Sequence, residues 1–232
     1  MSKTVSVVIA TFNRHEQCRR AIDSVLAQTH LPIEVIVVDD CSASPFEDDR
    51  VRVIRTPQNT KAMFGWASPG YVRTLGMREA RGDYVAFLDD DDIWLPHKLE
   101  VQFSAMEETG RDASCSEALI GYGTYDPNAQ HQNMMSHHFF NEIRHILATK
   151  NCYAIDNGFP RQFSYELLTK HNLVITSSVL VKRTILEKIG FMKTVPLGQE
   201  DYDCWLEVSK HGDFAFVNTP CIYYDTTPSN NR

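Results

Sequence analysis

Short apolar runs alternate with amphipathic stretches along the first hundred residues of the chain. The run Val5–Ala10 is apolar and rich in β-branched residues, which is typical of a strand covered on both faces. Apolar residues then recur at helical spacing as far as Leu26. A second predicted helix covers Val72–Ala80, and further strands are predicted over Ile33–Val38, Val51–Ile54 and Tyr84–Leu88. This alternation predicts an α/β domain with a doubly wound, mostly parallel sheet.

The second half of the chain has a less regular pattern. Residues 123–170 are rich in His, Asn, Tyr and Phe without clear periodicity, and we expect long loops and short helices there. Irregular segments of this length in compact domains are often binding loops. Strands are expected over Ala118–Tyr122, Val174–Val181 and Phe214–Tyr224, and helices around Leu99–Met106, over Thr184–Ile189 and over Asp201–Lys210.

The charge balance narrows the classes of partner. With 23 Lys and Arg against 30 Asp and Glu, the net charge of -7 argues against electrostatic binding to nucleic acid or anionic lipid. An anionic cofactor would therefore need a local cation or a metal. The six cysteines form no C-x-x-C pair and follow no secretory signal, which predicts a reducing, cytoplasmic location. Peripheral membrane association stays open, and nothing in the pattern indicates an oligomeric state.

Four consecutive carboxylates, Asp89 to Asp92, follow the predicted strand Tyr84–Leu88 directly. Like charges so close together cost free energy unless a cation or protons compensate them. Strand alternation would place Asp89 and Asp91 on the same side, and Mg²⁺ and Mn²⁺ prefer oxygen ligands. The motif predicts a divalent metal site. Its alternative is a solvated acidic turn before the helix near Pro96.

Polar clusters follow three of the predicted strands, at Thr11–Arg14, at Asp39–Asp40 and at Asp89–Asp92. Ligands of open α/β sheets bind outside the carboxyl ends of the strands. We therefore expect the three clusters to converge on one rim. Taken alone, Asp39 and Asp40 fit an ordinary turn after a strand equally well.

Four sequence blocks occur in an order that resembles the signature of the family 2 glycosyltransferases, inverting enzymes of GT-A fold. The blocks are Ser-Val-Val-Ile-Ala-Thr-Phe-Asn-Arg, Val-Val-Asp-Asp-Cys-Ser, Phe-Leu-Asp-Asp-Asp-Asp and Gln-Glu-Asp-Tyr-Asp-Cys-Trp. The resemblance covers residues 5–96 and 174–206. It implies transfer of a sugar from a nucleotide diphosphate to the hydroxyl of a glycan or glycoconjugate acceptor, in polysaccharide or glycoconjugate synthesis.

The same resemblance implies one GT-A domain over residues 1–232, a Rossmann-like sheet with a smaller acceptor-side region. Residues 1–96 would bind the nucleotide sugar and residues 97–232 the acceptor. The polar end Pro228–Arg232 fits a natural terminus and a cut within a longer chain equally well.

The resemblance also assigns donor contacts. Thr11 and the adjoining backbone would border the base, and Asp40 matches a carboxylate that binds a pyrimidine, which makes uridine the first choice before thymidine and guanosine. Arg73 would face the nucleotide or its phosphates. Asp91 would ligate Mn²⁺ or Mg²⁺ directly, with Asp89 beside the ribose or the metal's waters. The predicted donor contacts are Ala10, Thr11, Asn13, Arg14, Asp39, Asp40, Arg73, Asp89 and Asp90, with Asp91 and Asp89 as metal ligands.

A second acidic pair, Glu200 and Asp201, stands at the start of a predicted helix. Acidic residues there also stabilise the helix dipole, so capping alone would explain them. The resemblance implies that Asp201 is the base that takes the acceptor proton, with Glu200 as the second catalytic residue.

One element of related enzymes is missing. An Arg-x-His element near their end would fall at Asp225–Thr227, where neither Arg nor His occurs. The sequence therefore does not identify the residues that cover the diphosphate. Candidates for this role are His137, His138 and His145. Acceptor contacts are expected within residues 121–170, including Tyr122, His138, Phe139 and Phe163.

Two other functions compete with sugar transfer. A sugar nucleotidyltransferase also uses a nucleotide, carboxylates and Mg²⁺, but it would bring a Gly-rich phosphate loop near the first strand, and Thr11–Arg14 contains no glycine. A dehydrogenase fails for the same reason, because no G-x-G-x-x-G follows that strand. The other competitor is a noncatalytic nucleotide- or metal-binding module. The presence of both the Asp-rich block and Glu200–Asp201 argues against it.

Overall fold

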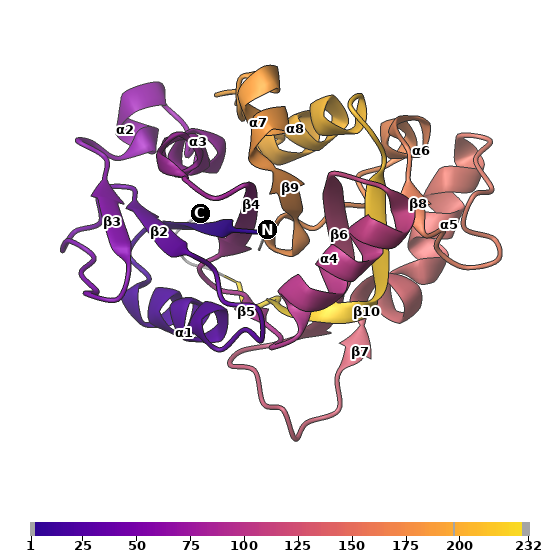
Figure 1. Ribbon diagram of the computed structural model, residues 1–232, viewed down its shortest axis with the longest axis horizontal. Coiled ribbons are helices and arrows are strands. Elements are labelled where there is room, and N and C mark those ends of the chain that lie inside the picture. Colours follow the sequence, from indigo (N-terminus) through magenta and orange to yellow (C-terminus); the bar gives the residue numbers. More distant parts are fainter. Residues whose placement is uncertain (1–2, 197, 229–232) are drawn as a thin grey trace.

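A mixed sheet of ten strands organises residues 3–196 and 198–228, which the computed structural model describes (Figure 1). The end of the chain beyond residue 228, where the sequence left two interpretations open, lies outside the described residues. The strand order along the main path is β3-β2-β1-β4-β9-β6-β10-β5, with β7 beside β6 and β8 beside β10. The strands are β1 (Val5–Thr11), β2 (Glu34–Asp39), β3 (Arg52–Arg55), β4 (Tyr84–Asp89), β5 (Ile93–Trp94), β6 (Ala113–Gly121), β7 (Gln132–Asn133), β8 (Gln162–Phe163), β9 (Leu180–Lys182) and β10 (Phe214–Asp225).

The strands β1 to β4 form the parallel part of the sheet. β1 lies between β2 and β4 and runs parallel to both, and β3 runs parallel to β2 on the outer side. The register sets Thr11 opposite Asp39 and Ala10 opposite Asp89, so the polar ends of these strands lie at one edge. This confirms the predicted parallel arrangement and the predicted rim.

Helices cover both faces of the sheet (Figure 1). Because side chains alternate along β1, Val7 and Ile9 pack on the face covered by α1 and α4, whereas Val8 packs on the face covered by α3 and α8. A Cβ on Gly76 of α3 would come within 2.5 Å of Val8 Cγ1, so glycine lets this helix approach the sheet closely. The helices are α1 (His15–Leu26), α2 (Thr60–Phe64), α3 (Pro69–Glu79), α4 (Lys98–Thr109), the π-helix η1 (Met134–His138), α5 (Phe140–Thr149), α6 (Tyr165–Lys170), the 3₁₀ turn η2 (Thr176–Ser178), α7 (Arg183–Ile189) and α8 (Glu200–Ser209).

The second half extends the same sheet with mixed strand directions. β9 runs antiparallel to its neighbours β4 and β6, whereas β6 and β10 are parallel to each other. The irregular character of residues 123–170 is confirmed, with η1, α5 and α6 as the helices among the described loops. None of the helices described in residues 3–196 and 198–228 combines the length and the apolar character needed to cross a membrane.

The predicted strand over Val174–Val181 is wrong for most of its length. Ser178 N donates to the carbonyl of Ile175 at 2.9 Å, and Ser178 Oγ donates to the same carbonyl at 2.7 Å, so η2 forms and the strand starts only at Leu180. Hydroxyl side chains compete with the strand ladder for backbone groups in this way. The predicted strand over Ala118–Tyr122 is real but begins earlier, at Ala113.

Candidate active site

The acidic cluster after β4 lies in a tight turn at the carboxyl edge of the sheet. β4 ends at Asp89, and Asp92 N donates to the carbonyl of Asp89 at 3.1 Å. The turn gathers Asp89, Asp91 and Asp92, whose nearest carboxylate oxygens all lie within 4.8 Å of one another. The predicted pair Asp89 and Asp91 is therefore brought together, although by a turn rather than by strand alternation. Asp92 is an additional candidate ligand that the spacing argument missed.

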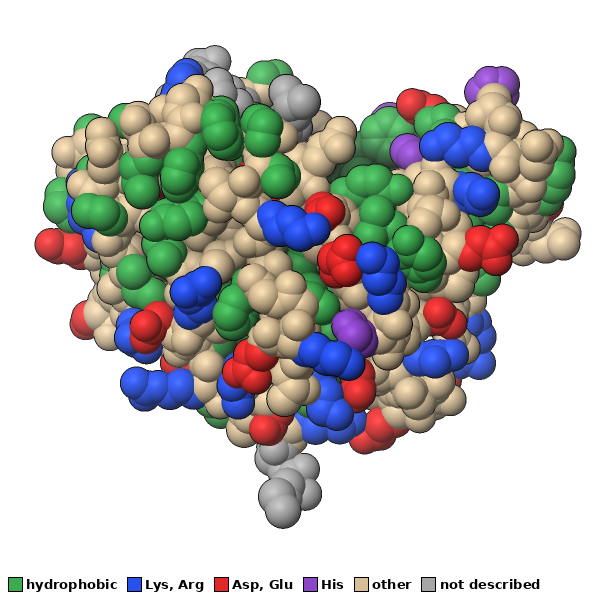
Figure 2. All heavy atoms as spheres, turned by 90° about the horizontal axis from the view of Figure 1, so that it is seen from above, with side chains coloured by type: hydrophobic (Ala, Val, Ile, Leu, Met, Phe, Trp, Pro, Cys, Tyr) green, Lys and Arg blue, Asp and Glu red, His purple; other side chains and the backbone are tan. Residues whose placement is uncertain are grey.

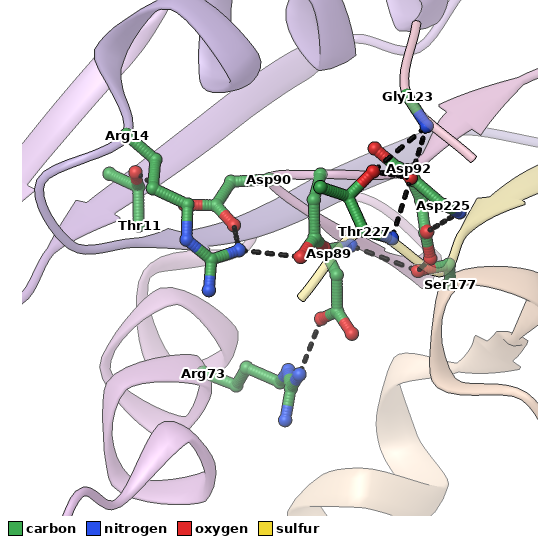
Figure 3. A network of polar contacts seen from close by, with 11 residues as sticks. Thr11, Arg14, Arg73, Asp89, Asp90, Asp92, Gly123, Ser177, Asp225 and Thr227 are labelled. Carbon is green, nitrogen blue, oxygen red and sulfur yellow. Dashed lines mark hydrogen bonds and ion pairs between the residues drawn. The ribbon is translucent and has the colours of Figure 1, made fainter. Parts of the chain in front are cut away.

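Asp90 points away from this group and toward the loop after β1. Its carboxylate accepts a hydrogen bond from Thr11 Oγ1 at 2.7 Å (Figure 3). It also forms an ion pair with Arg14, whose Nη1 lies 2.8 Å from Asp90 Oδ1. Burial raises the pKa of Asp90 to about 7 and raises that of Asp92 well above its ordinary value. The predicted contacts Thr11, Arg14 and Asp90 thus form one network.

Two guanidinium groups compensate the acidic cluster, one from the loop before α1 and one from α3 (Figure 3). Arg14 Nη1 lies 2.6 Å from Asp91 Oδ2, and Arg73 of α3 forms an ion pair with Asp89. Burial by itself would lower the pKa of the Arg14 guanidinium. The negative charges of Asp90 and Asp91 outweigh this effect, so the pKa of Arg14 is raised. The predicted donor contact Arg73 therefore reaches the same edge of the sheet from a different helix.

The Asp39 side chain holds the loop after β2. It is fully buried, pairs with Arg55 and accepts from the backbone N–H groups of Ser42 and Phe46 at 2.9 and 3.2 Å. These partners give Asp39 a structural role, and its contact with the donor stays a prediction. Asn13 ties the same loop to β1, since its Oδ1 accepts from Ala43 N at 2.8 Å.

Asp40 fixes the start of α2. Its carboxylate accepts from Thr60 N at 2.9 Å and Thr60 Oγ1 at 2.6 Å, and from Asn59 Nδ2 at 3.0 Å. Burial raises the pKa of Asp40, although these hydrogen bonds oppose that rise. Asp40 is 7% exposed, so its contact with a base stays a prediction.

The acidic pair at the start of α8 divides into one buried and one accessible carboxylate. Glu200 is 2% exposed, lies beneath Gly70 of α3, and accepts from Ser68 Oγ at 3.3 Å. This position makes Glu200 a support for the start of α8, and its catalytic role stays a prediction. Asp201 accepts from Thr176 Oγ1 at 2.8 Å and from Tyr202 N at 2.7 Å, and it lines a pocket.

That pocket joins the two halves of the molecule. It has a volume of about 330 Å³. The residues that line it include both Asp89 and Asp201, which are far apart in the sequence. Figure 2 shows the surface hollowed between the lobe at the right, which carries α5, and the body of the molecule, with hydrophobic side chains on the walls. Those walls come from η1, α5 and residues 171–176, and include Met134, Met135, Phe139, Ile143, Ile146 and Leu173.

The four residues expected to contact the acceptor lie in different surroundings in the structure. Phe139 lines the pocket, and its contact with the acceptor stays a prediction. Tyr122 is 73% exposed and His138 is exposed on the surface, whereas Phe163 is fully buried and stacks on Phe216 in the core, so its prediction is wrong. The histidine among the described lining residues is His171, and burial lowers its pKa.

The segment that replaces the Arg-x-His element closes the acidic cluster by hydrogen bonds. Asp225 N donates to Asp92 Oδ1 at 3.1 Å, and Asp225 Oδ1 accepts from Gly123 N at 2.8 Å (Figure 3). Thr227 Oγ1 also accepts from Gly123 N, at 2.8 Å. This segment supplies anchoring but no cation.

The fold resembles that of a crystallised sugar-transfer enzyme. The structure of S. aureus TarS 1-349 in complex with UDP-GlcNAc superposes with a TM-score of 0.66 and 15% sequence identity, over 99% of this chain and 60% of that one. The chain covers 37% of the longer crystallised form of TarS. This likeness confirms the predicted GT-A architecture.

Curated relatives and a family model place the chain in a family. It is 26% identical over 221 residues to the Escherichia coli UDP-Glc:alpha-D-GlcNAc-diphosphoundecaprenol beta-1,3-glucosyltransferase WfgD, covering 92% of this chain and 73% of that protein. It is also 26% identical to an uncharacterized glycosyltransferase of Haemophilus influenzae, covering 94% and 67%. The model described as Glycosyl transferase family 2 matches residues 6–189, and the chain therefore belongs to this family.

Proposed function

We propose that the chain transfers a sugar from a uridine diphosphate donor to an acceptor hydroxyl with inversion, and that this transfer depends on Mn²⁺ or Mg²⁺. The observation that carries the proposal is the single pocket lined by Asp89, from the acidic cluster, and by Asp201, at the start of α8. A group for the leaving diphosphate and a group for the nucleophile thus face the same space. The name of WfgD and the UDP-GlcNAc complex of TarS describe donors of those proteins and support the choice of a uridine donor.

The acidic cluster fits a divalent cation by its chemistry. Three carboxylates with oxygens within 4.8 Å offer the hard ligands that Mg²⁺ and Mn²⁺ prefer. We assign Asp91 and Asp89 as ligands, with Asp92 as a buried third carboxylate beside them. When bound, such a cation neutralises charge on the departing diphosphate as a Lewis acid, so no protonated side chain is needed there.

Asp201 is assigned as the base that accepts the proton of the acceptor hydroxyl. Thr176 Oγ1 and Tyr202 N hold its two oxygens in place. A carboxylate fixed by two donors is oriented for proton transfer without rearrangement. In a single displacement with inversion, the nucleophile attacks on the side opposite the leaving group, which matches a base on α8 and a leaving-group site after β4.

The remaining donor contacts follow from their place on the rim. We assign Ala10, Thr11 and Asn13 to the nucleotide, and Arg14, Arg73 and Asp90 to the diphosphate end, where Arg14 pairs with Asp90. Residues 1–96 then form the donor half and residues 97–232 the acceptor half of one domain. A glycan or glycoconjugate acceptor, a cytoplasmic location and association with a membrane face stay predictions.

The test is a panel of nucleotide sugars incubated with Mn²⁺, with donor hydrolysis and thermal stabilisation by UDP as readouts. We expect a uridine donor to be hydrolysed slowly, and Asp201→Asn to keep UDP binding while transfer falls by about 10² to 10⁴ fold. Asp203→Asn is the matched control, because Asp203 lies on the same helix and pairs with Lys193 at 2.9 Å instead. Stabilisation by UDP without turnover of any donor would favour a noncatalytic binding module.

A further inference from the structure

The diphosphate of the proposed donor needs a cation besides the metal, and the end of the chain does not bring one. Asp225 and Thr227 bond to Gly123 and to the acidic cluster, as described above. The cationic groups that the structure does bring to the cluster are those of Arg14 and Arg73. The two differ in the carboxylates that they bind, since Arg14 pairs with Asp90 and Asp91 and Arg73 pairs with Asp89.

Arg73 and Arg14 reach the cluster from different elements. Arg73 sits within α3, with its side chain 9% exposed and its ion pair on Asp89. Arg14 stands in the loop before α1, with its side chain 15% exposed. Its backbone is held, because its carbonyl accepts from Cys18 N at 2.9 Å, and its side chain approaches the cluster from this loop.

Arg14 binds the carboxylate that the proposed function gives to the metal. Its Nη1 lies 2.6 Å from Asp91 Oδ2 and 2.8 Å from Asp90 Oδ1. A divalent cation on Asp91 would stand close to this guanidinium, and two cations at such a separation repel each other strongly in a site shielded from water. The guanidinium and the metal therefore compete for the same carboxylate.

We propose that Arg14 is an internal counter-ion that yields Asp91 to the metal and then pairs with the donor's diphosphate. The inference rests on the proposed function and adds a positioning residue to it. Because Asp91 is next to both the metal and Arg14, a phosphate that joins the metal comes within reach of the guanidinium. The donor thereby removes the competitor of its own metal, and metal and donor bind cooperatively. Arg14 takes over the cationic role that the segment 225–227 does not supply.

The test measures Mn²⁺ and UDP binding by calorimetry on the whole chain, for wild type, Arg14→Met and Asp91→Asn. Without UDP, Arg14→Met should bind Mn²⁺ about tenfold more tightly than wild type, because the competing charge is gone. With saturating Mn²⁺, the same variant should bind UDP about tenfold or more weakly, because a charge-assisted hydrogen bond is lost. A merely structural role would not tighten metal binding.

Arg52→Met is the matched control, because Arg52 forms an exposed ion pair with Glu79 and its loss should leave both affinities unchanged. Equal Mn²⁺ affinity of Arg14→Met and wild type would overturn the counter-ion role, and unchanged UDP affinity would overturn the diphosphate role. If instead Asp91→Asn binds Mn²⁺ as wild type does, the proposed metal site itself fails. This outcome is separate, because it does not depend on Arg14. Arg14→Lys, which keeps the charge, should lie between wild type and Arg14→Met in both measurements.

Discussion

The proposed donor half, residues 1–96, and the proposed acceptor half, residues 97–232, place their site residues by different means. In the donor half most site residues lie at or just after the ends of strands, because parallel strands in register end at one edge, and Arg73 reaches this edge from α3. In the acceptor half, Asp201 comes from a helix start and Thr176 from a 3₁₀ turn, and the pocket walls come from loops and short helices. The comparison teaches that the order of the parallel strands positions the charged residues proposed to bind the metal and the diphosphate. The acceptor end depends on segments packed around it.

The strongest test of the donor half is Asp91→Ala. We expect Mn²⁺-dependent UDP binding to be lost and transfer to fall by about 10³ fold or more, because several kcal/mol of charge stabilisation disappear. Calorimetry with Mn²⁺ and UDP measures the first effect and initial rates the second. The melting temperature should not fall, because one of several adjacent like charges is removed. Asp23→Ala, an exposed carboxylate in the same half, should change neither measurement.

Gly70→Ala tests how the two halves are joined. A Cβ on Gly70 would come within 2.5 Å of Glu200 Cβ, so α3 and the start of α8 must separate. We expect the free energy of unfolding to fall by about 1–3 kcal/mol and kcat to fall about tenfold, because Asp201 moves with Glu200. Urea denaturation and initial rates check both. Gly76→Ala is the control: its Cβ would meet Val8 instead, so it should lose similar stability with a much smaller loss of kcat.

Phe139→Ala separates acceptor binding from donor binding. Phe139 lines the wall of the pocket in the acceptor half. Its removal should raise the acceptor KM by about five- to tenfold, as expected for losing roughly 1 kcal/mol of apolar contact, and leave UDP affinity unchanged. Steady-state kinetics with each substrate varied in turn gives the answer. Tyr153→Ala removes an aromatic ring that is 61% exposed, and it serves as the control. A loss of UDP affinity in Phe139→Ala would contradict the division into halves.

Lys98 gives the smallest effect and concerns stability rather than activity. It is fully buried, with Nζ 2.5 Å from Gln102 Oε1 and 4.2 Å from the ring centroid of Trp94. Burial lowers the pKa of Lys98 to about 7, so above pH 7 the unfolded chain binds a proton that the folded chain does not. The free energy of unfolding should therefore rise by up to about 1.4 kcal/mol per pH unit from pH 7 toward pH 8.

Lys98→Met should remove that slope and increase stability near pH 7. Urea denaturation at pH 7, 7.5 and 8 measures it. The window ends near pH 8 because burial raises the pKa values of four thiols, which makes stability fall once thiols of the unfolded chain ionise. The four thiols are those of Cys18, Cys115, Cys204 and Cys221. An equal slope in wild type and Lys98→Met would show that other groups set the pH dependence.

The sequence pattern identified the elements of the donor half because buried parallel strands are nearly continuous apolar runs. The acidic runs after β2 and β4 then marked the edge where ligands bind. The same reasoning could not divide these carboxylates by role. Asp39 is buried against Arg55, Asp90 pairs with Arg14, and Asp91 belongs to the group of three carboxylates that could hold a metal ion. In the sequence all three look alike. Only the direction of each side chain separates them.

The residues that sequence reasoning missed act across long sequence separations. Thr176 holds Asp201, and Ser177 Oγ donates to Asp92 of a distant turn. A Thr-Ser-Ser run after an apolar stretch is a signal for such a turn, because these hydroxyls bond to nearby backbone groups. Lys98 gave no signal, since a lysine in an amphipathic helix is normally exposed.

By itself, the sequence determined the alternating α/β order, the rim of carboxylates and the family, because local hydrophobic periodicity and motif spacing carry that information. The tertiary structure alone decided that Asp89 and Asp201 share a pocket, that Glu200 is buried beneath Gly70, and that Arg14 reaches Asp91. These are contacts between segments far apart in the chain. They depend on strand order and on the packing of helices against the sheet, which no local pattern encodes.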